Sequence, residues 1–206
     1  MRKRYTLIHI LFSALLCAGL LASCATDDFV EDPARQKASR FTEKAYEEAR
    51  KRGEKPDWDR VLKLATRAIK EDPAYPLPYS LRGAAYNAKD NPVMALHDLD
   101  RAIELSSDFS PAFVNRGISY MKLKLYDLAL LDFESALELE PENITSLVNI
   151  AQIFTIENDI PIACLYIEKA VVMGLDDLNL LYTEPAFEPL VYSGCLEKQE
   201  NRLMGR

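Results

Sequence analysis

An interval of 34 residues recurs along this chain, and it constrains the fold more than any other feature of the sequence. Positions one interval apart keep the same kind of side chain, whether small, aromatic or large and apolar. The columns are Gly83/Gly117/Ala151, Tyr86/Tyr120/Phe154, Ala95/Ala129/Ala163, Leu99/Phe133/Ile167 and Ala68/Ala102/Ala136/Ala170. Self-similarity at this period indicates a repeat architecture, in which each unit buries its apolar face against its neighbours.

The order of small, aromatic, small, large and small residues resembles the tetratricopeptide repeat (TPR), a helix-turn-helix unit. Arg82 and Arg116, each directly before a glycine, match a variant of this family. The resemblance implies an all-α solenoid of about four units and a C-terminal capping element, the segment YTEPAFEPL. The first unit is degenerate, with Ala49 in the glycine column. We place the units at about 42–75, 76–109, 110–143 and 144–177.

Close packing of the two helices within a unit explains these residue types. We expect Gly83 and Gly117 on the first helices to face Ala95 and Ala129 on the second helices, so that the backbones approach closely. The repeat tyrosines then fill the space towards the next unit. The periodic residues are therefore expected to form the core and not to bind a cofactor.

The N-terminal region carries a different kind of signal. A basic triplet at 2–4 is followed by an apolar run to Ala22, which is the order of a secretory signal peptide. The segment Leu21-Ala22-Ser23-Cys24 resembles the bacterial lipobox, so we predict a signal peptide over 1–23 and lipidation of Cys24. An ordinary cleaved signal followed by a chance cysteine is the alternative.

The lipobox resemblance identifies the chain as a bacterial lipoprotein of the cell envelope, anchored in the outer membrane. Several acyl chains on Cys24 would hold it far more strongly than the single chain that gives only marginal membrane binding. Asp27 and Asp28 resemble an export tag of surface lipoproteins, and a plain spacer is the competing interpretation. Periplasmic and surface exposure both remain open.

These assignments divide the chain into four parts and indicate where much of its negative charge lies. The parts are a signal peptide at 1–23, a lipidated N-terminus and flexible tether at 24–38, a TPR domain at 39–192 and a C-terminal tail at 193–206. The formal net charge of −7 argues against a nucleic-acid partner, which needs a basic surface. Carboxylates of the second helices are expected on a solvated outer face: Asp98, Asp100, Asp132, Glu134 and Glu138.

The sequence offers little for catalysis, so we predict a protein that is not an enzyme and holds neither a cofactor nor a metal. Its seven glycines form no phosphate-binding loop. His97 is the only histidine outside the signal peptide, which excludes a histidine-based zinc cluster. A nucleophile made by His97 with Cys164 or Cys195 is not expected, because Cys164 lies two units away from His97. A disulfide between the two cysteines remains open.

The TPR resemblance also implies a concave groove lined by the first helices. Asn115 and Asn149 share one groove column, and their amides could hold the backbone of an extended peptide through a donor and an acceptor each. A polar groove without a ligand is the alternative. The candidate protein-binding residues are Asn87, Val114, Asn115, Ile118, Lys122, Val148, Asn149 and Gln152.

Chaperone-binding members of the family grip a C-terminal carboxylate with lysine, asparagine and arginine side chains. The matching columns here hold Ser80, Ala84, Asn115, Thr145 and Asn149. Only the central asparagine remains, so we predict no carboxylate clamp.

The function that these features predict is a lipid-anchored, non-catalytic scaffold or adaptor. Its expected partners are other envelope proteins or extended peptides, and the membrane through the lipid on Cys24; homo-oligomerisation is left open. The alternative is a solute-binding or transporter-associated TPR lipoprotein, which would need a closed cavity between units.

Overall fold

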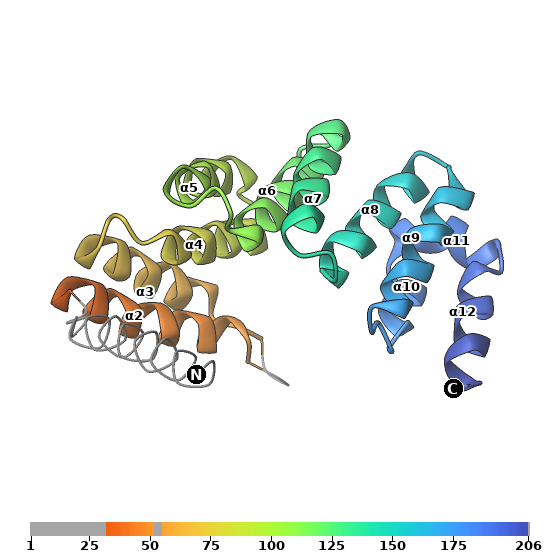
Figure 1. The fold of residues 1–206 in the computed structure, drawn as a ribbon, viewed down its shortest axis with the longest axis horizontal. Helices are drawn as coiled ribbons and strands as arrows, with labels where there is room; N and C mark the ends of the chain where they lie inside the picture. The colour runs from red at the N-terminus through yellow and green to blue at the C-terminus, as the bar shows by residue number, and fades with distance from the viewer. Residues whose placement is uncertain (1–31, 52–54, 206) are drawn as a thin grey trace, which may run out of the picture.

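Antiparallel helix pairs follow one another along the long axis of the molecule, in a computed structural model that describes residues 32–51 and 55–205 (Figure 1). The pairs are α2 (Pro33–Ala49) with α3 (Trp58–Glu71), α4 (Pro76–Ala88) with α5 (Pro92–Leu105), α6 (Ser110–Lys122) with α7 (Tyr126–Leu139), and α8 (Ile144–Ile156) with α9 (Ile160–Val172). They are followed by α10 (Asn179–Thr183), the 3-10 helix η1 (Pro185–Phe187), α11 (Glu188–Tyr192) and α12 (Cys195–Met204). The described residues contain no strand, and the predicted all-α solenoid is confirmed.

The 34-residue interval of the sequence is also the interval of the helices. The first helices α4, α6 and α8 begin at residues 76, 110 and 144, and the second helices α5, α7 and α9 begin at residues 92, 126 and 160. These starts agree with the units predicted from the sequence. Prolines stand in the first turn of several of these helices, where a missing backbone N–H costs no intrahelical hydrogen bond.

A tight turn with a left-handed residue joins the two helices of each of these three units. Asp90, Lys124 and Asn158 have φ values of 59°, 60° and 63°. In each turn the amide of the next residue donates to the carbonyl of the repeat aromatic residue, at 2.8 to 2.9 Å. This is the Schellman motif of helix C-termini. Because no glycine marks the column, the sequence analysis gives no sign of it.

The repeat glycines face a different partner from the expected one. A Cβ atom on Gly83 would lie 2.7 Å from Cγ of Leu99, and one on Gly117 would lie 2.7 Å from Cε1 of Phe133. Both distances are too short for non-bonded carbon atoms. The large apolar residue of the second helix, and not the neighbouring alanine, is therefore what requires a glycine.

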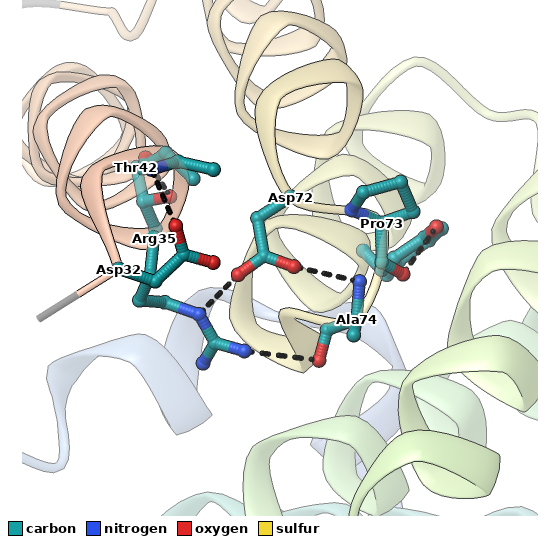
Figure 2. Close-up of polar contacts among 9 residues, drawn as sticks. Asp32, Arg35, Thr42, Asp72, Pro73 and Ala74 are labelled. Carbon is teal, nitrogen blue, oxygen red and sulfur yellow. Dashed lines mark hydrogen bonds and ion pairs between the residues drawn. The ribbon is translucent and has the colours of Figure 1, made fainter.

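Helix α2 begins before the predicted TPR boundary, so residues 33–38 of the expected tether are helical. Asp32 caps α2 by accepting a hydrogen bond from an amide of the first turn at 3.0 Å, and Pro33 follows at the first helical position. Arg35 forms an ion pair with Asp72 at the end of α3 and donates to a carbonyl just beyond it (Figure 2). The acidic residues of this segment thus include a helix cap.

The C-terminal segment predicted as a tail folds back on the last repeat unit. Leu196 and Gln199 of α12 are fully buried. Cys195, the first residue of α12, forms a disulfide with Cys164 of α9, with the two Cα atoms 5.9 Å apart. The folded region therefore continues through α12 instead of ending at residue 192.

The predicted capping segment shares an apolar core with the last repeat unit. Phe187 of η1 and Leu190 of α11 are buried in one cluster with Ile167 of α9 and Leu181 of α10. A solenoid needs an atypical element to cover the open face of its final repeat. These short helices have that place in the stack (Figure 1).

Candidate protein-binding surface

The first helices α4, α6 and α8 carry the residues that the sequence assigns to a binding groove. Two of the eight are buried, because Asn87 is 4% exposed and Val114 is 8% exposed. Asn87 lies between α4 and α6, where its Nδ2 donates to the carbonyl of Asn115 at 2.8 Å. Val114 belongs to the core of the third unit. Neither side chain is available to a ligand in this structure.

Asn115 is also occupied by the protein itself. Its Nδ2 donates to Oγ of Ser80 at 3.1 Å, and Oγ of Ser119 donates to Oδ1 of Asn87 at 2.9 Å. Both serines are buried. The four side chains form a polar network that joins α4 to α6. The structure therefore gives both asparagines a structural role. Asn87 is buried, whereas Asn115 is half-buried, and contact of Asn115 with a ligand stays a prediction.

The other five predicted residues remain at least partly exposed, and we call them the groove strip. Lys122 is held by an ion pair with Asp90 in the turn after α4, with Nζ and Oδ1 3.0 Å apart. Asn149 donates its amide N–H to the carbonyl of Thr145 at 2.8 Å, which leaves its Oδ1 as an acceptor. The accessible part of the groove thus follows α6 and α8. The groove strip is Ile118, Lys122, Val148, Asn149 and Gln152.

The C-terminal cap turns the end of the groove strip into a cavity of about 430 Å³, which we call the terminal pocket. Leu181 and Phe187, both nearly fully buried, give it apolar walls, while Asp177 and Glu184 are exposed carboxylates in its lining. The repeat pattern of the sequence does not predict this pocket, because its walls come from α8 and from the segment after the repeats. The complete lining is Ile144, Thr145, Val148, Asn149, Gln152, Leu175, Asp177, Leu181, Glu184 and Phe187.

Buried ion pairs also repeat at the 34-residue interval. Arg82 contacts both carboxylate oxygens of Asp98 at 2.7 Å, and Arg116 contacts those of Asp132 at 2.9 and 2.8 Å. Asp98 is 2% exposed and Asp132 is 4% exposed. This corrects the expectation that both lie on a solvated face. A two-pronged contact with guanidinium satisfies each carboxylate between the helices.

Burial and ion pairing shift the pKa values of Asp132 and Arg116 in opposite directions. Burial raises the pKa of Asp132 above its ordinary value, and the hydrogen bonds from Arg116 oppose that rise. The hydrogen bond to Asp132 raises the pKa of Arg116, which also contacts Asp100 at 2.8 Å. The guanidinium therefore stays charged, and the pair holds two helices together.

The fourth unit replaces the ion pair with an apolar pair. Ile150 and Tyr166 stand one interval after Arg116 and Asp132. Both pack in the apolar cluster of the third and fourth units, and Tyr166 stacks on Phe154 with the ring centroids 5.9 Å apart. The two members change together because a lone charge here would be buried without a partner.

The Cys-His nucleophile considered from the sequence is not formed. His97 is exposed on α5, whereas Cys164 and Cys195 are bonded to each other. Within residues 32–51 and 55–205, no three His, Cys, Asp or Glu side chains gather in a way that could hold a metal ion. No helix in these ranges combines the length and the apolar character needed to span a bilayer. Cys24 and the predicted signal peptide lie outside the described residues.

Comparisons with known proteins support the repeat assignment. Residues 110–143, the bounds of the predicted third unit, match the family described as "Tetratricopeptide repeat". Serine/threonine-protein phosphatase 5 of Rattus norvegicus is 27% identical over 128 residues, which are 62% of this chain and 26% of that protein. RNA polymerase II-associated protein 3 of Mus musculus is 31% identical over 86 residues, 42% of this chain and 13% of that protein. The similarity thus spans about a quarter or less of these relatives.

Solved structures share the fold over more than half of the chain. The first TPR of Spaghetti, bound to the HSP90 peptide SRMEEVD, is 26% identical and covers 58% of this chain and 91% of its own, with a TM-score of 0.53. The Arabidopsis OM64 TPR domain is 27% identical and covers 58% and 96%, with a TM-score of 0.53. Together with the helix pairs and the matched unit, these similarities identify a TPR domain in this chain.

Proposed function

We propose that this protein is a non-catalytic TPR adaptor that binds segments of other proteins, and that a lipid on Cys24 anchors it at the outer membrane of a bacterial envelope. The observation that carries the proposal is the groove strip along α6 and α8. Its apolar and amide side chains stay accessible, while the neighbouring Asn87 and Asn115 hold the helices together.

An extended peptide fits this surface better than a small charged ligand does. Apolar side chains such as Ile118 and Val148 can take side chains of a peptide, and Asn149 and Gln152 can bond to its backbone. The Spaghetti TPR, which shares the fold, has been solved with an HSP90 peptide, and this supports a peptide ligand here.

The ligand is not expected to be recognised through a C-terminal carboxylate. The columns that would supply the cations hold neutral residues, Ser80, Thr145 and Asn149. The remaining asparagine of the clamp, Asn115, donates to Ser80 instead. Recognition should therefore depend on side chains within the peptide.

Two separate features support a location in the cell envelope. The lipobox and the preceding basic and apolar segments predict export and lipidation. The disulfide between Cys164 and Cys195 suits an oxidising compartment, because cytosolic thiols are generally kept reduced.

Site-specific photocrosslinking in the native envelope tests the binding surface. A crosslinking residue in place of Lys122 or Gln152 should capture a protein partner, because both belong to the groove strip. The matched control is His97, which is exposed on a second helix. Capture of the same proteins from position 97 would contradict a groove-directed adaptor.

Fractionation of cells tests the anchor separately. Cys24→Ala should move the protein from the membrane fraction to the soluble fraction, because the lipid would be lost. Cys17→Ala, which changes a cysteine inside the predicted signal peptide, is the control and should leave the membrane fraction unchanged. A Cys24→Ala protein that stays membrane-bound would refute lipidation at this residue.

A further inference from the structure

We propose that the terminal pocket binds a basic peptide segment, which inserts one large apolar side chain between α8 and the C-terminal cap. The inference rests on the proposed adaptor function and specifies one binding site and the chemistry of its partner.

The pocket can accept an apolar anchor because its walls are apolar and two of them belong to the folded core. Its apolar lining comes from Ile144 and Val148 of α8, from Leu175, and from Leu181 and Phe187 of the cap. Phe187 and Leu181 are fixed in the core that also holds the disulfide. The volume of about 430 Å³ lies at the lower end of the range of known ligand pockets, roughly 300–1,000 Å³, and suits one side chain with its flanking backbone.

The charge around the pocket selects a basic partner. Asp177 and Glu184 stand in its lining, and an adjoining depression, which shares Ile144 and Thr145 with the pocket, adds Glu140 and Glu142. Neither lining contains a lysine or an arginine.

These carboxylates are also available to a partner. In the described part of the chain none of the four forms an ion pair with a basic side chain; Asp177 accepts hydrogen bonds from Asn179, and Glu140 accepts one from Asn143. Two carboxylates of the pocket and two of the adjoining depression are therefore uncompensated. Lysine or arginine residues beside the apolar anchor of a peptide would provide the complementary charge.

The amides of α8 provide the contacts that distinguish a peptide from a simple hydrophobic ligand. Asn149 has a free amide oxygen, and Gln152 has no hydrogen-bond partner among the described residues. Each can bond to the backbone of an inserted segment, which needs both donors and acceptors.

Binding of synthetic peptides to the purified full chain, in detergent and with the disulfide intact, tests the inference. The probes are three short fluorescent peptides with the same central leucine and phenylalanine, flanked by lysine, serine or glutamate. The lysine peptide should bind at least about tenfold more tightly than the glutamate peptide, and rising salt should weaken it, since the carboxylates are exposed.

Two variants and a matched control locate the binding. Glu142→Lys/Glu184→Lys should weaken the lysine peptide about tenfold, whereas Glu43→Lys/Glu47→Lys, with the same change of charge on exposed residues of α2, should alter it less than about twofold. Val148→Trp should fill the cavity and weaken all three peptides, with the helix content checked by circular dichroism. Equal losses in the variant and the control, or equal binding of all three peptides, would overturn the inference.

The remaining outcomes separate this inference from the proposed function. A small molecule that co-purifies with the chain and is released by Val148→Trp, detected by native mass spectrometry, would assign the pocket to a solute and overturn the peptide assignment. Partner capture from Lys122, outside the pocket, without binding of any peptide would overturn the pocket inference alone. Loss of capture from every groove position would overturn the adaptor function as well.

Discussion

Single glycines determine how closely the two helices of the second and third units approach. Gly117 lies against the ring of Phe133 and Gly83 lies against Leu99, so in each case the missing Cβ makes room for a larger side chain. In the fourth unit Ala151 stands in the glycine column and Ile167 in the other. Leucine and isoleucine have the same volume, so between the second and fourth units the alanine goes with a change in the shape of its partner, and not in its size.

Gly117→Ala should destabilise the protein by about 1–3 kcal/mol, because its Cβ would overlap the Phe133 ring at 2.7 Å. Chemical denaturation measures the change. The double variant Gly117→Ala/Phe133→Ile copies the fourth unit and should be less destabilised than the sum of the two single variants. Strict additivity would show that the two positions are not coupled.

The left-handed turn residues give a second prediction at this scale. Lys124 has a φ of 60°, which costs energy for a residue with a Cβ and is relieved in glycine. Lys124→Gly should therefore raise the free energy of unfolding by about 0.5 kcal/mol. Asn158→Gly should gain less, because asparagine tolerates this conformation. A larger gain at position 158, in the same denaturation assay, would contradict the explanation.

Residue patterns predict the packing columns here but not the polar contacts of individual residues. The small and large columns could be found from the sequence because packing between helices restricts side-chain size. The sequence predicts a ligand contact for Asn87 and Asn115, because an amide suits a peptide and a neighbouring helix equally well. The hydrogen bonds with Ser80 and Ser119 show the second use, and they depend on tertiary placement that the sequence does not reveal.

Pairs of helices are held together differently along the stack. The second and third units use buried arginine-aspartate pairs, whereas the fourth unit has Ile150 and Tyr166 at the same positions. The arginine before the glycine is visible in the sequence as a family variant. Its partner is not, because Asp98 and Asp132 resemble the exposed carboxylates of the same helices until their burial is known.

Removal of one member of the arginine-aspartate pair should lower the free energy of unfolding much more than replacement of both members. Asp132→Ala leaves the Arg116 guanidinium without its main partner between the helices and should destabilise the protein by about 3 kcal/mol. Arg116→Ile/Asp132→Tyr reproduces the fourth unit and should recover most of that loss. Thermal and urea denaturation of the three proteins provide the comparison. A double variant as unstable as Asp132→Ala would show that the apolar pair depends on its own neighbours.

The described part of the chain is a solenoid, and a disulfide links its last repeat unit to the C-terminal helix. The disulfide joins α9 to α12 over a separation of 31 residues and encloses the helices of the cap. The sequence leaves this bond open, because the spacing of two cysteines does not reveal whether a C-terminal segment folds back. Residues 33–38 and 195–204 are helical where the sequence predicts a tether and a tail. Leu196 and Gln199 show their burial only through tertiary contacts, whereas the cap that Asp32 forms on α2 is local.

Reduction of this disulfide should lower the free energy of unfolding by about 4 kcal/mol, as estimated for a loop of this length. Urea denaturation with and without reductant measures the difference. Cys164→Ser/Cys195→Ser should match the reduced protein and should not respond to reductant. An unchanged midpoint on reduction would mean that buried residues such as Leu196 hold α12 without the bond.

The disulfide at the C-terminal end should make the solenoid unfold from its other end, where α2 lies. Units of a solenoid contact mainly their neighbours, so unfolding can start at an end and proceed unit by unit. At one end α2 is held by non-covalent contacts such as the pair of Arg35 with Asp72, while at the other end a covalent bond prevents α12 from separating from α9. Mechanical tension applied through an anchored N-terminus would act first on α2, which is held by non-covalent contacts. The terminal pocket, which lies in the covalently closed part, would then keep its shape while the first unit separates.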